Sequence, residues 1–270
     1  MTPPLILIFG PVDPSGADGL PADAVTSARL GCHGLATATA LTVQDTAGIE
    51  DIHPVPPELL DDQARCLLED MPVQAFKVGG LYSAEAASVV AQIAADYSQV
   101  PLVLHLSPRS VPSQDPAAQD DAEDLLAATL ELVLPQTDLV VVEHLRLAQW
   151  HADGDINIGD SPSPMHALAA AGAQWVLVLG TPVRPGHHAN VLLGPGGQTA
   201  TWPWQAPPER NADTGGVAAT AAAAMLAQGL EMPAAVEQAL RHADETLATA
   251  FLAGMGRRVP NRIGSGATTS

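Results

Sequence analysis

The chain has 270 residues, of which 47% are hydrophobic and only 3% aromatic, and its formal net charge is −19. This length suits one large α/β domain. So acidic a chain offers no basic patch, which argues against a nucleic-acid partner or an anionic membrane. The apolar run near the N-terminus lacks a basic flank and is too short to span a bilayer. We therefore expect a cytoplasmic protein with no membrane or nucleic-acid partner.

Strands and helices are predicted to alternate along the chain. Continuous apolar runs predict buried strands at residues 5–9, 34–43, 75–78, 102–106, 139–142 and 175–179. Apolar residues at helical spacing predict helices at 21–30, 57–71, 84–97, 122–134, 165–171, 217–227 and 233–252. This alternation is typical of a single α/β domain with a mostly parallel sheet covered by helices on both faces.

Three stretches depart from this alternation. Residues 107–121 are polar, contain three prolines and are expected to form a surface loop. The turn at 194–197 lies between two apolar runs and predicts a hairpin. The residues from 257 to 270 are expected to be a mobile tail, so the folded domain is predicted to cover 1–256.

Ligands of such folds bind beyond the carboxyl ends of the strands. The glycine-containing loop at 10–19 follows the first strand but lacks the lysine of a nucleotide-binding Walker loop. Alone it is better explained as a tight turn. Asp23 and Gln44 would lie near the same sheet edge, where a carboxylate and a carboxamide suit a flat heterocycle. Each of the two alone is better explained as a helix-start residue or a solvated loop residue.

The stretch "DTGGVAAT" from Asp213 forms a third candidate. Thr214, Gly215 and Gly216 precede an alanine-rich helix, and the free amides of such a helix start can bind a phosphate or another anion. The alternative is an ordinary helix start capped by the side chain of Thr214 or Asp213. The spacing alone does not decide between these two interpretations.

Together these stretches resemble the hydroxymethylpyrimidine and phosphomethylpyrimidine kinase family of thiamin biosynthesis, within the ribokinase-like superfamily. The resemblance extends from about residue 5 to residue 260, and it is most specific in the N-terminal third. It is carried by "DPSGADGLPAD" at 13–23, "LGCHG" at 30–34, "TATALTVQDT" at 37–46, "KVGG" at 77–80 and "TG" at 214–215.

The resemblance implies a ribokinase-like single domain, and it adds roles for several residues. In the family an aminopyrimidine is bound through the equivalents of Asp23 and Gln44, and the resemblance also places Gly10 and Gly80 at the substrate. ATP then phosphorylates the hydroxymethyl group or a phosphate already on it, and Mg²⁺ is required. Members often form homodimers, so a homodimer is expected here by resemblance only.

Pro21 stands where the family tends to have glutamine, and the other departures from the family pattern concern phosphotransfer. His105 stands where the family has an aspartate near magnesium, and Leu179 stands where it has a lysine near the nucleotide phosphates. The family's Asn-x-x-Glu motif aligns with 143–146, which leaves Glu143 as the candidate metal ligand. Gly216 stands where the family has a cysteine as catalytic base. An alternative alignment places Ala219 at the base, and neither residue accepts a proton.

These departures leave three hypotheses open. In the first, the chain is a pyrimidine-binding homologue that is impaired in phosphotransfer or lacks it. In the second, it is an active kinase with rearranged catalysis. In the third, it phosphorylates or binds another small molecule. No lysine follows Lys77, so an arginine such as Arg184 would have to contact the nucleotide phosphates. Asp213 or a water molecule would have to serve as the base. We expect ATP and Mg²⁺ as cofactors if the chain is active, and otherwise none.

Overall fold

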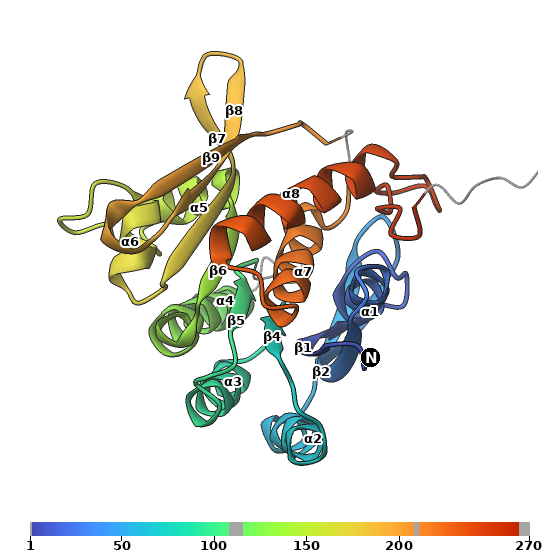
Figure 1. Cartoon of the computed structure of the whole chain (residues 1–270). Helices are drawn as coiled ribbons and strands as arrows, with labels where there is room; N and C mark the ends of the chain where they lie inside the picture. Colours follow the sequence, from blue (N-terminus) through green and yellow to red (C-terminus); the bar gives the residue numbers. More distant parts are fainter. Residues whose placement is uncertain (1, 108–115, 208–210, 265–270) are drawn as a thin grey trace, which may run out of the picture.

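A nine-stranded sheet lies between two layers of helices in the computed structural model, which describes residues 2–107, 116–207 and 211–264 (Figure 1). The strand order is β3-β2-β1-β4-β5-β6-β7-β8-β9. The six strands from β2 to β7 in this order pair in parallel, while β3, β8 and β9 pair antiparallel with their neighbours. The parallel part of the sheet places the carboxyl ends of six strands at one edge.

The strands are β1 (Leu5–Val12), β2 (His33–Gln44), β3 (Ile49–Pro54), β4 (Ala75–Val78), β5 (Leu102–His105), β6 (Leu139–Glu143), β7 (Trp175–Arg184), β8 (His187–Leu193) and β9 (Thr199–Pro203). The α-helices are α1 (Gly19–Arg29), α2 (Pro57–Asp70), α3 (Ala84–Asp96), α4 (Pro116–Ala128), α5 (His144–Asp153), α6 (Pro164–Ala170), α7 (Thr214–Ala227) and α8 (Met232–Ala248). A π-helical turn (Thr129–Val133) and a 3₁₀ turn (Leu134–Gln136) continue α4.

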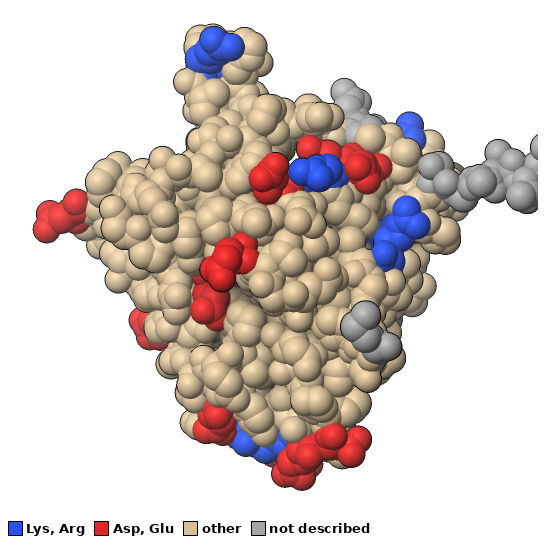
Figure 2. Space-filling view, in the orientation of Figure 1, with Lys and Arg blue, Asp and Glu red and all other residues tan. Residues whose placement is uncertain are grey.

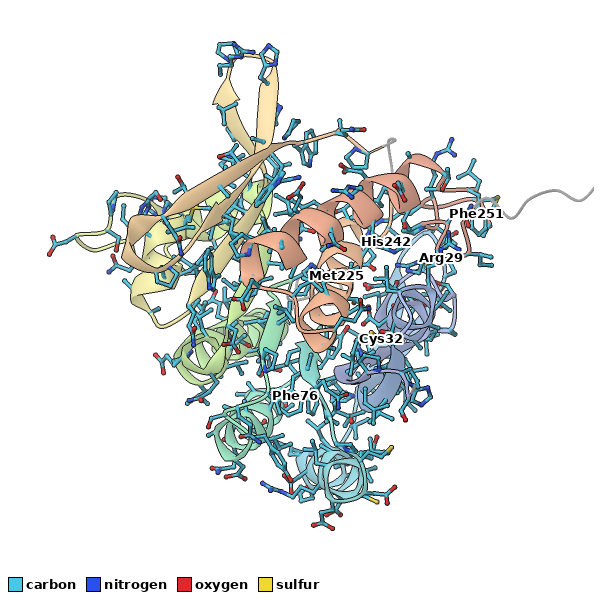
Figure 3. All side chains as sticks on the ribbon, in the orientation of Figure 1. Arg29, Cys32, Phe76, Met225, His242 and Phe251 are labelled. Carbon is cyan, nitrogen blue, oxygen red and sulfur yellow. The ribbon has the colours of Figure 1, made fainter. Side chains whose placement is uncertain are left out.

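Two hydrophobic cores lie on opposite faces of the sheet. One joins the sheet to the helices from α2 to α6, and the other joins it to α1, α7 and α8. In the first core Phe76 lies edge-on to Phe9 and to Tyr97, with ring centroids 6.2 and 6.4 Å apart (Phe76 is labelled in Figure 3). Only 3% of the residues are aromatic, so most of the remaining core is filled by aliphatic side chains.

Helix α7 is buried on all sides. Eleven of its fourteen residues are buried, and it lies between the sheet and α8 (Figure 1). A helix that is apolar all round is stable only when it is enclosed in this way. Its run of alanines allows close approach to the sheet, so the first turn of α7 is fixed against the carboxyl ends of β5 and β6.

The structure confirms the predicted α/β class and the strands and helices named from the sequence, with shifted bounds. It also confirms the hairpin, in which Gly194–Gln198 connect β8 to β9. No helix within the described residues is long and apolar enough to cross a membrane.

Three elements were not predicted, and one prediction was wrong in part. Strand β3, helix α5 and the β7–β8 hairpin had no counterpart in the sequence interpretation. The expected surface loop at 107–121 is shorter, because α4 begins at Pro116. Residues 108–115 of that expected loop lie outside the described residues.

The segment from Phe251 to Arg262 packs against the domain, although its second half was expected to be part of a mobile tail. The backbone N–H of Arg257 donates to the carbonyl of Thr46, and the carbonyl of Arg258 accepts from Ala212. Val259 and Arg262 are buried. We call residues 251–262 the C-terminal segment. The mobility expected for residues 265–270 concerns residues outside the described part of the chain.

Candidate active site

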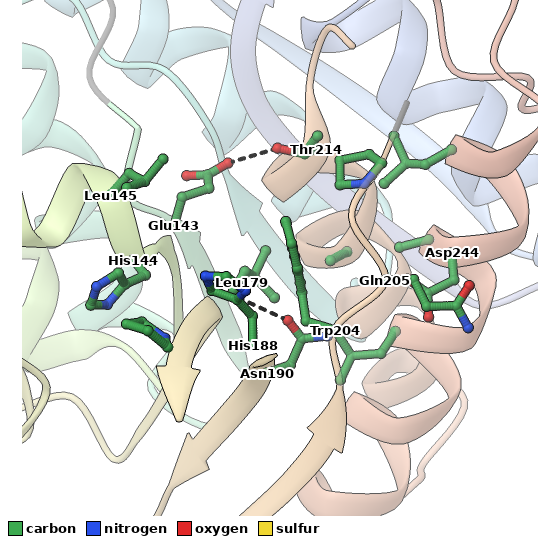
Figure 4. Close-up of a pocket in the computed structure, with 17 residues that line it drawn as sticks. Glu143, His144, Leu145, Leu179, His188, Asn190, Trp204, Gln205, Thr214 and Asp244 are labelled. Atoms are coloured by element: carbon green, nitrogen blue, oxygen red, sulfur yellow. Dashed lines mark hydrogen bonds between the residues drawn. The ribbon is translucent and has the colours of Figure 1, made fainter. Parts of the chain in front are cut away.

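A cavity of about 340 Å³ opens between the β7–β8–β9 strands and helices α7 and α8 (Figure 4). It lies beyond the carboxyl ends of β6 and β7, where ligands of α/β folds bind. The residues that line it are Glu143, His144, Leu145, Leu179, Gly180, Pro182, His188, Asn190, Trp204, Gln205, Pro207, Thr214, Ala218, Leu240, Ala243, Asp244 and Leu247.

One wall of this cavity presents an aromatic side chain to its interior. The indole of Trp204 lies against the His188 imidazole, with ring centroids 5.3 Å apart, and it projects into the cavity in Figure 4. Gly180 has a positive φ of 71°, and a Cβ there would lie 3.2 Å from the indole. The Gly180 N–H donates to Oδ1 of Asn190 at 3.2 Å, which fixes that carboxamide. An indole face beside a fixed carboxamide suits a flat heteroaromatic ring.

The described part of the cavity wall carries no fixed positive charge. No lysine or arginine occurs among its described lining residues, whose two carboxylates are Glu143 and Asp244. His144 and His188 are the groups that can become cationic. Burial, and secondly the charge of His188, lowers the pKa of His144, which favours the neutral imidazole at neutral pH. Phosphate groups bound here would therefore depend on backbone amides and on protonated histidine.

The first turn of α7 forms the inner end of the cavity. Asp213 is the N-cap residue of α7, but its side chain makes no capping hydrogen bond. The Thr214 hydroxyl donates instead to Oε1 of Glu143 at 3.3 Å. Neither side chain caps the helix, which argues against the ordinary helix start that the sequence left open. A Cβ on Gly215 would overlap the His105 imidazole and lie 2.5 Å from Oε1 of Glu143, so only glycine fits there.

His105 and Glu143 come from the ends of neighbouring strands β5 and β6. Nε2 of His105 lies 3.8 Å from Oε1 of Glu143, a distance suited to charge attraction and too long for a hydrogen bond. Burial alone would raise the pKa of Glu143, but His105 and the hydrogen bond from Thr214 lower it to about 2. Glu143 is thus ionised at neutral pH, and 31% of its side chain is exposed. It is the one sequence-predicted metal ligand.

Asp213 adopts a strained backbone conformation beside this pair. It is the one non-glycine residue among those described that has a positive φ, of 47°. Its side chain is fully buried, and Oδ2 accepts a hydrogen bond from the guanidinium of Arg262 at 2.8 Å. Burial, and secondly the charge of Asp18, raises the pKa of Asp213 to about 7, although Arg262 and His105 act to lower it.

Asp23 lies in a buried network. Its carboxylate accepts hydrogen bonds from Nζ of Lys77 and from the hydroxyl of Thr220, both at 2.6 Å. The side chains of Asp23 and Lys77 are each 2% exposed. In this structure the carboxylate therefore connects α1, β4 and α7 and faces neither described cavity. Its predicted contact with a pyrimidine stays a prediction, and it would require a partner of Asp23 to be displaced.

The other predicted substrate residues lie at the same edge of the sheet. Gln44 is the half-buried last residue of β2. Gly10 lies within β1, opposite Ala38 of β2. Gly80 follows β4, its carbonyl accepts from the hydroxyl of Thr39 at 2.7 Å, and it lines a second, smaller cavity together with His105. These positions are compatible with one substrate site, but their roles stay predictions.

Two arginines lie at positions that differ from those expected from the sequence. Arg184, the suggested substitute for a phosphate-binding lysine, is exposed at the end of β7, at the tip of the β7–β8 hairpin. Figure 2 shows Lys or Arg in blue at that tip, and also near the centre, on the right and at the lower end of this face. Arg262, expected in the mobile tail, is buried beside Asp213. Among the described residues, Arg262 is the arginine that pairs with Asp213, and the sequence around it did not indicate this contact.

The wall formed by Trp204, His188 and Asn190 was also missed. The sequence indicated a hairpin over part of this region but assigned no function to its polar and aromatic residues. Leu179 lines the cavity, and its alignment with the family's phosphate-binding lysine stays a prediction.

Comparison with known proteins identifies the family. The family model described as phosphomethylpyrimidine kinase matches residues 13–261. The chain belongs to the phosphomethylpyrimidine kinase family. It is 35% identical over 267 residues to the hydroxymethylpyrimidine/phosphomethylpyrimidine kinase of Mycobacterium tuberculosis, an alignment that covers 95% of this chain and 92% of the relative.

Solved structures show that this chain has a ribokinase-like fold. The phosphomethylpyrimidine kinase of Clostridium difficile superposes with a TM-score of 0.71 at 20% identity, over 90% of this chain and 98% of that one. The pyridoxal kinase of Staphylococcus aureus, in complex with AMP-PCP and pyridoxal, superposes with a TM-score of 0.81 at 19% identity. That alignment covers 99% of this chain and 96% of the pyridoxal kinase.

Proposed function

We propose that this chain binds the hydroxymethylpyrimidine precursor of thiamin and phosphorylates it from ATP, at a rate well below that of its relatives. The observation that carries this proposal is the first turn of α7. Its uncapped amides lie at the inner end of the cavity, beside Glu143 and His105, so phosphate groups of a ligand in the cavity could bind to them.

The cavity is suited to the base of the nucleotide. The indole of Trp204 can stack on a purine, and the fixed carboxamide of Asn190 can hydrogen-bond to its edge. A pyridoxal kinase of the same fold has been solved with AMP-PCP bound, which supports a nucleotide as one ligand of this chain. The pyrimidine would bind on the other side of α7, near Gln44 and Gly80.

Mg²⁺ fits the site through Glu143. Mg²⁺ commonly takes one or two carboxylates and completes its shell with phosphate oxygens and water. Glu143 is ionised and partly exposed at the edge of the cavity, next to the expected phosphates. When bound, the ion would neutralise charge on the phosphates. No cluster of three or more His, Cys, Asp or Glu side chains that could hold a metal occurs among the described residues.

The proposed slow rate follows from the charges around the cavity. Phosphoryl transfer depends mainly on positioning and on stabilising negative charge at the phosphates. The described residues that line the cavity supply no ammonium or guanidinium group, and the chain's one lysine is held by Asp23. The amides of α7, His105 and Glu143-bound Mg²⁺ remain for this task. We infer a weakened but not an absent transition-state stabilisation.

The proposal is tested by measuring binding and turnover separately. Calorimetry with hydroxymethylpyrimidine should show saturable binding that Gln44→Ala weakens. Turnover with ATP and Mg²⁺ should be detectable, and slower by about 10²-fold or more than that of the M. tuberculosis relative assayed beside it. A Glu143→Gln variant of the same preparation controls for contaminating host kinase, because it should lose the activity.

Two results would overturn this proposal in different ways. Absence of pyrimidine binding would show that the substrate is another small molecule. Turnover equal to that of the relative would show that the replaced residues do not impair phosphotransfer.

A further inference from the structure

Asp213 combines three features that an ordinary helix-start aspartate does not have. Its backbone is in the left-handed region, its carboxylate is fully buried, and that carboxylate does not cap α7. Strained residues persist only where the surrounding structure holds them, and they cluster at functional sites. A buried aspartate that gives no capping bond to its own helix therefore needs another explanation.

One oxygen of this carboxylate has no partner. Oδ2 is paired with Arg262, whereas Oδ1 is buried and has no hydrogen-bond partner among the described residues. Nε2 of His105 is also buried without a hydrogen-bond partner. Buried polar atoms are normally satisfied, so such atoms call for a specific explanation. His105 Nε2 faces Gly215 and Asp213 Oδ1 faces Gly216, so both unpartnered atoms adjoin the first turn of α7, where a ligand would complete their hydrogen bonding.

The carboxylate also occupies the side-chain space of the first turn of α7. A Cβ on Gly216 would lie 2.6 Å from Cγ of Asp213 and would overlap Oδ1. The Asp213 side chain thus fills the volume into which any side chain at residue 216 would project. Gly216 must therefore lack a side chain for Asp213 to keep its strained conformation and its present side-chain position.

We propose that the Asp213 carboxylate is the proton acceptor of the phosphotransfer step, with Arg262 as the positioning residue that holds it. This inference rests on the proposed function. As the substrate hydroxyl oxygen bonds to the γ-phosphorus of ATP, the bond from that phosphorus to the β–γ bridging oxygen breaks and ADP leaves. The hydroxyl proton passes to Oδ1 of Asp213. In the family a cysteine at the position of Gly216 accepts this proton. Here the carboxylate of Asp213, three residues earlier, takes over that role.

Arg262 holds the acceptor from the C-terminal segment. Its guanidinium donates to Oδ2 of Asp213 and also to the carbonyl of Ala17, at 2.8 and 3.1 Å. This double contact leaves Oδ1 as the free oxygen. Besides Arg262, the charged and titratable groups that act on Asp213 are Asp18 and Asp23 of the α1 region and His105 of β5.

The test is the rate and pH dependence of pyrimidine phosphorylation by the full chain. Asp213→Asn should lower kcat by roughly 10²–10⁴-fold, the usual contribution of a general base, while KM for the pyrimidine changes little. Gly216→Ala keeps the carboxylate but displaces it, and should also lower kcat. The double variant Asp213→Gly with Gly216→Cys places a thiol in the same volume and should recover part of the lost rate.

Arg262→Gln tests the positioning role through a pH profile. Arg262 favours the ionised carboxylate, so its loss should move the acid limb of kcat/KM to higher pH. Arg258→Gln is the matched control, since Arg258 lies in the same segment but donates to the carbonyl of Ala250. An unmoved limb in Arg262→Gln would overturn the positioning role.

The base assignment and the proposed function fail in distinguishable ways. Full kcat in a folded Asp213→Asn variant, with active wild type, overturns the base assignment alone. Absence of turnover in wild type overturns both. If Asp213→Asn does not fold, an unchanged kcat in Gly216→Ala serves as the result that overturns the assignment.

Discussion

The raised pKa of Asp213 predicts an unusual dependence of stability on pH. The pKa is about 7 in the folded protein, against an ordinary value of 3.8, so the folded state binds this proton more tightly than the unfolded chain. The stabilisation from this proton is fully present below about pH 4 and is lost as the pH rises to about 7. Asp213→Asn removes the titrating group, so the free energy of unfolding of the variant should not fall in this way as the pH rises.

The size of the effect follows from the two pKa values. Between pH 5 and pH 8 the folded protein must release the proton over the interval from 5 to about 7, roughly two pH units. Each pH unit corresponds to about 1.4 kcal/mol, so the gap in free energy of unfolding between Asp213→Asn and wild type should widen by about 3 kcal/mol in favour of the variant. Any cost of leaving Arg262 beside an amide is the same at both pH values and cancels.

Urea unfolding of both proteins at pH 5 and pH 8 measures this gap. Asp62→Asn is the matched control, because it makes the same change in net charge at an exposed residue of α2 and should leave the gap unchanged. A gap that stays constant, or that narrows as the pH rises, would refute the reasoning. Asp213 would then be ionised throughout the range and stabilised by Arg262.

Three further predictions follow from other parts of the structure. Lys77→Met should destabilise the fold by about 3–5 kcal/mol in urea unfolding, because it leaves the buried Asp23 carboxylate without its cation; an equal loss in the double variant with Asp23→Asn would contradict this explanation. Nucleotide affinity measured by calorimetry should rise as the pH falls below the ordinary range of a histidine, because burial lowers the pKa of His144, and His144→Gln should reduce that rise. Gly194→Ala should lower stability by about 1–3 kcal/mol, because its Cβ would lie 2.5 Å from Cε3 of the Trp175 ring, and unchanged thermal unfolding by circular dichroism would exclude that clash.

The parallel part of the sheet could be predicted because its strands are buried on both faces and read as apolar runs. Strand β3 could not, since its sequence "IEDIHP" has charged and polar residues that face solvent at the sheet edge. Helix α5 follows β6 without an intervening glycine or proline, and Glu143 both ends the strand and precedes the helix. Sequence patterns mark such a boundary poorly, because the usual turn residues are missing.

The candidate site could be predicted only where its residues carry a local sequence signal. The glycines at the start of α7 carry a local signal, and the structure shows why Gly215 has no side chain. The contact between Asp213 and Arg262 joins residues 49 apart in the sequence, and a polar, proline-containing C-terminus gave no indication of burial. The left-handed conformation of Asp213 also has no local signature, because it is imposed by the surrounding structure.

The single lysine has a practical consequence for studying the protein. Lys77 lies in the central strand β4 and is 2% exposed, so a lysine-specific protease has one cleavage site, and the folded sheet conceals it. Cleavage then requires the sheet to open at its centre, and its rate reports the population or the rate of that opening. Limited digestion with such a protease would follow how pyrimidine or nucleotide stabilises the native chain, without any label.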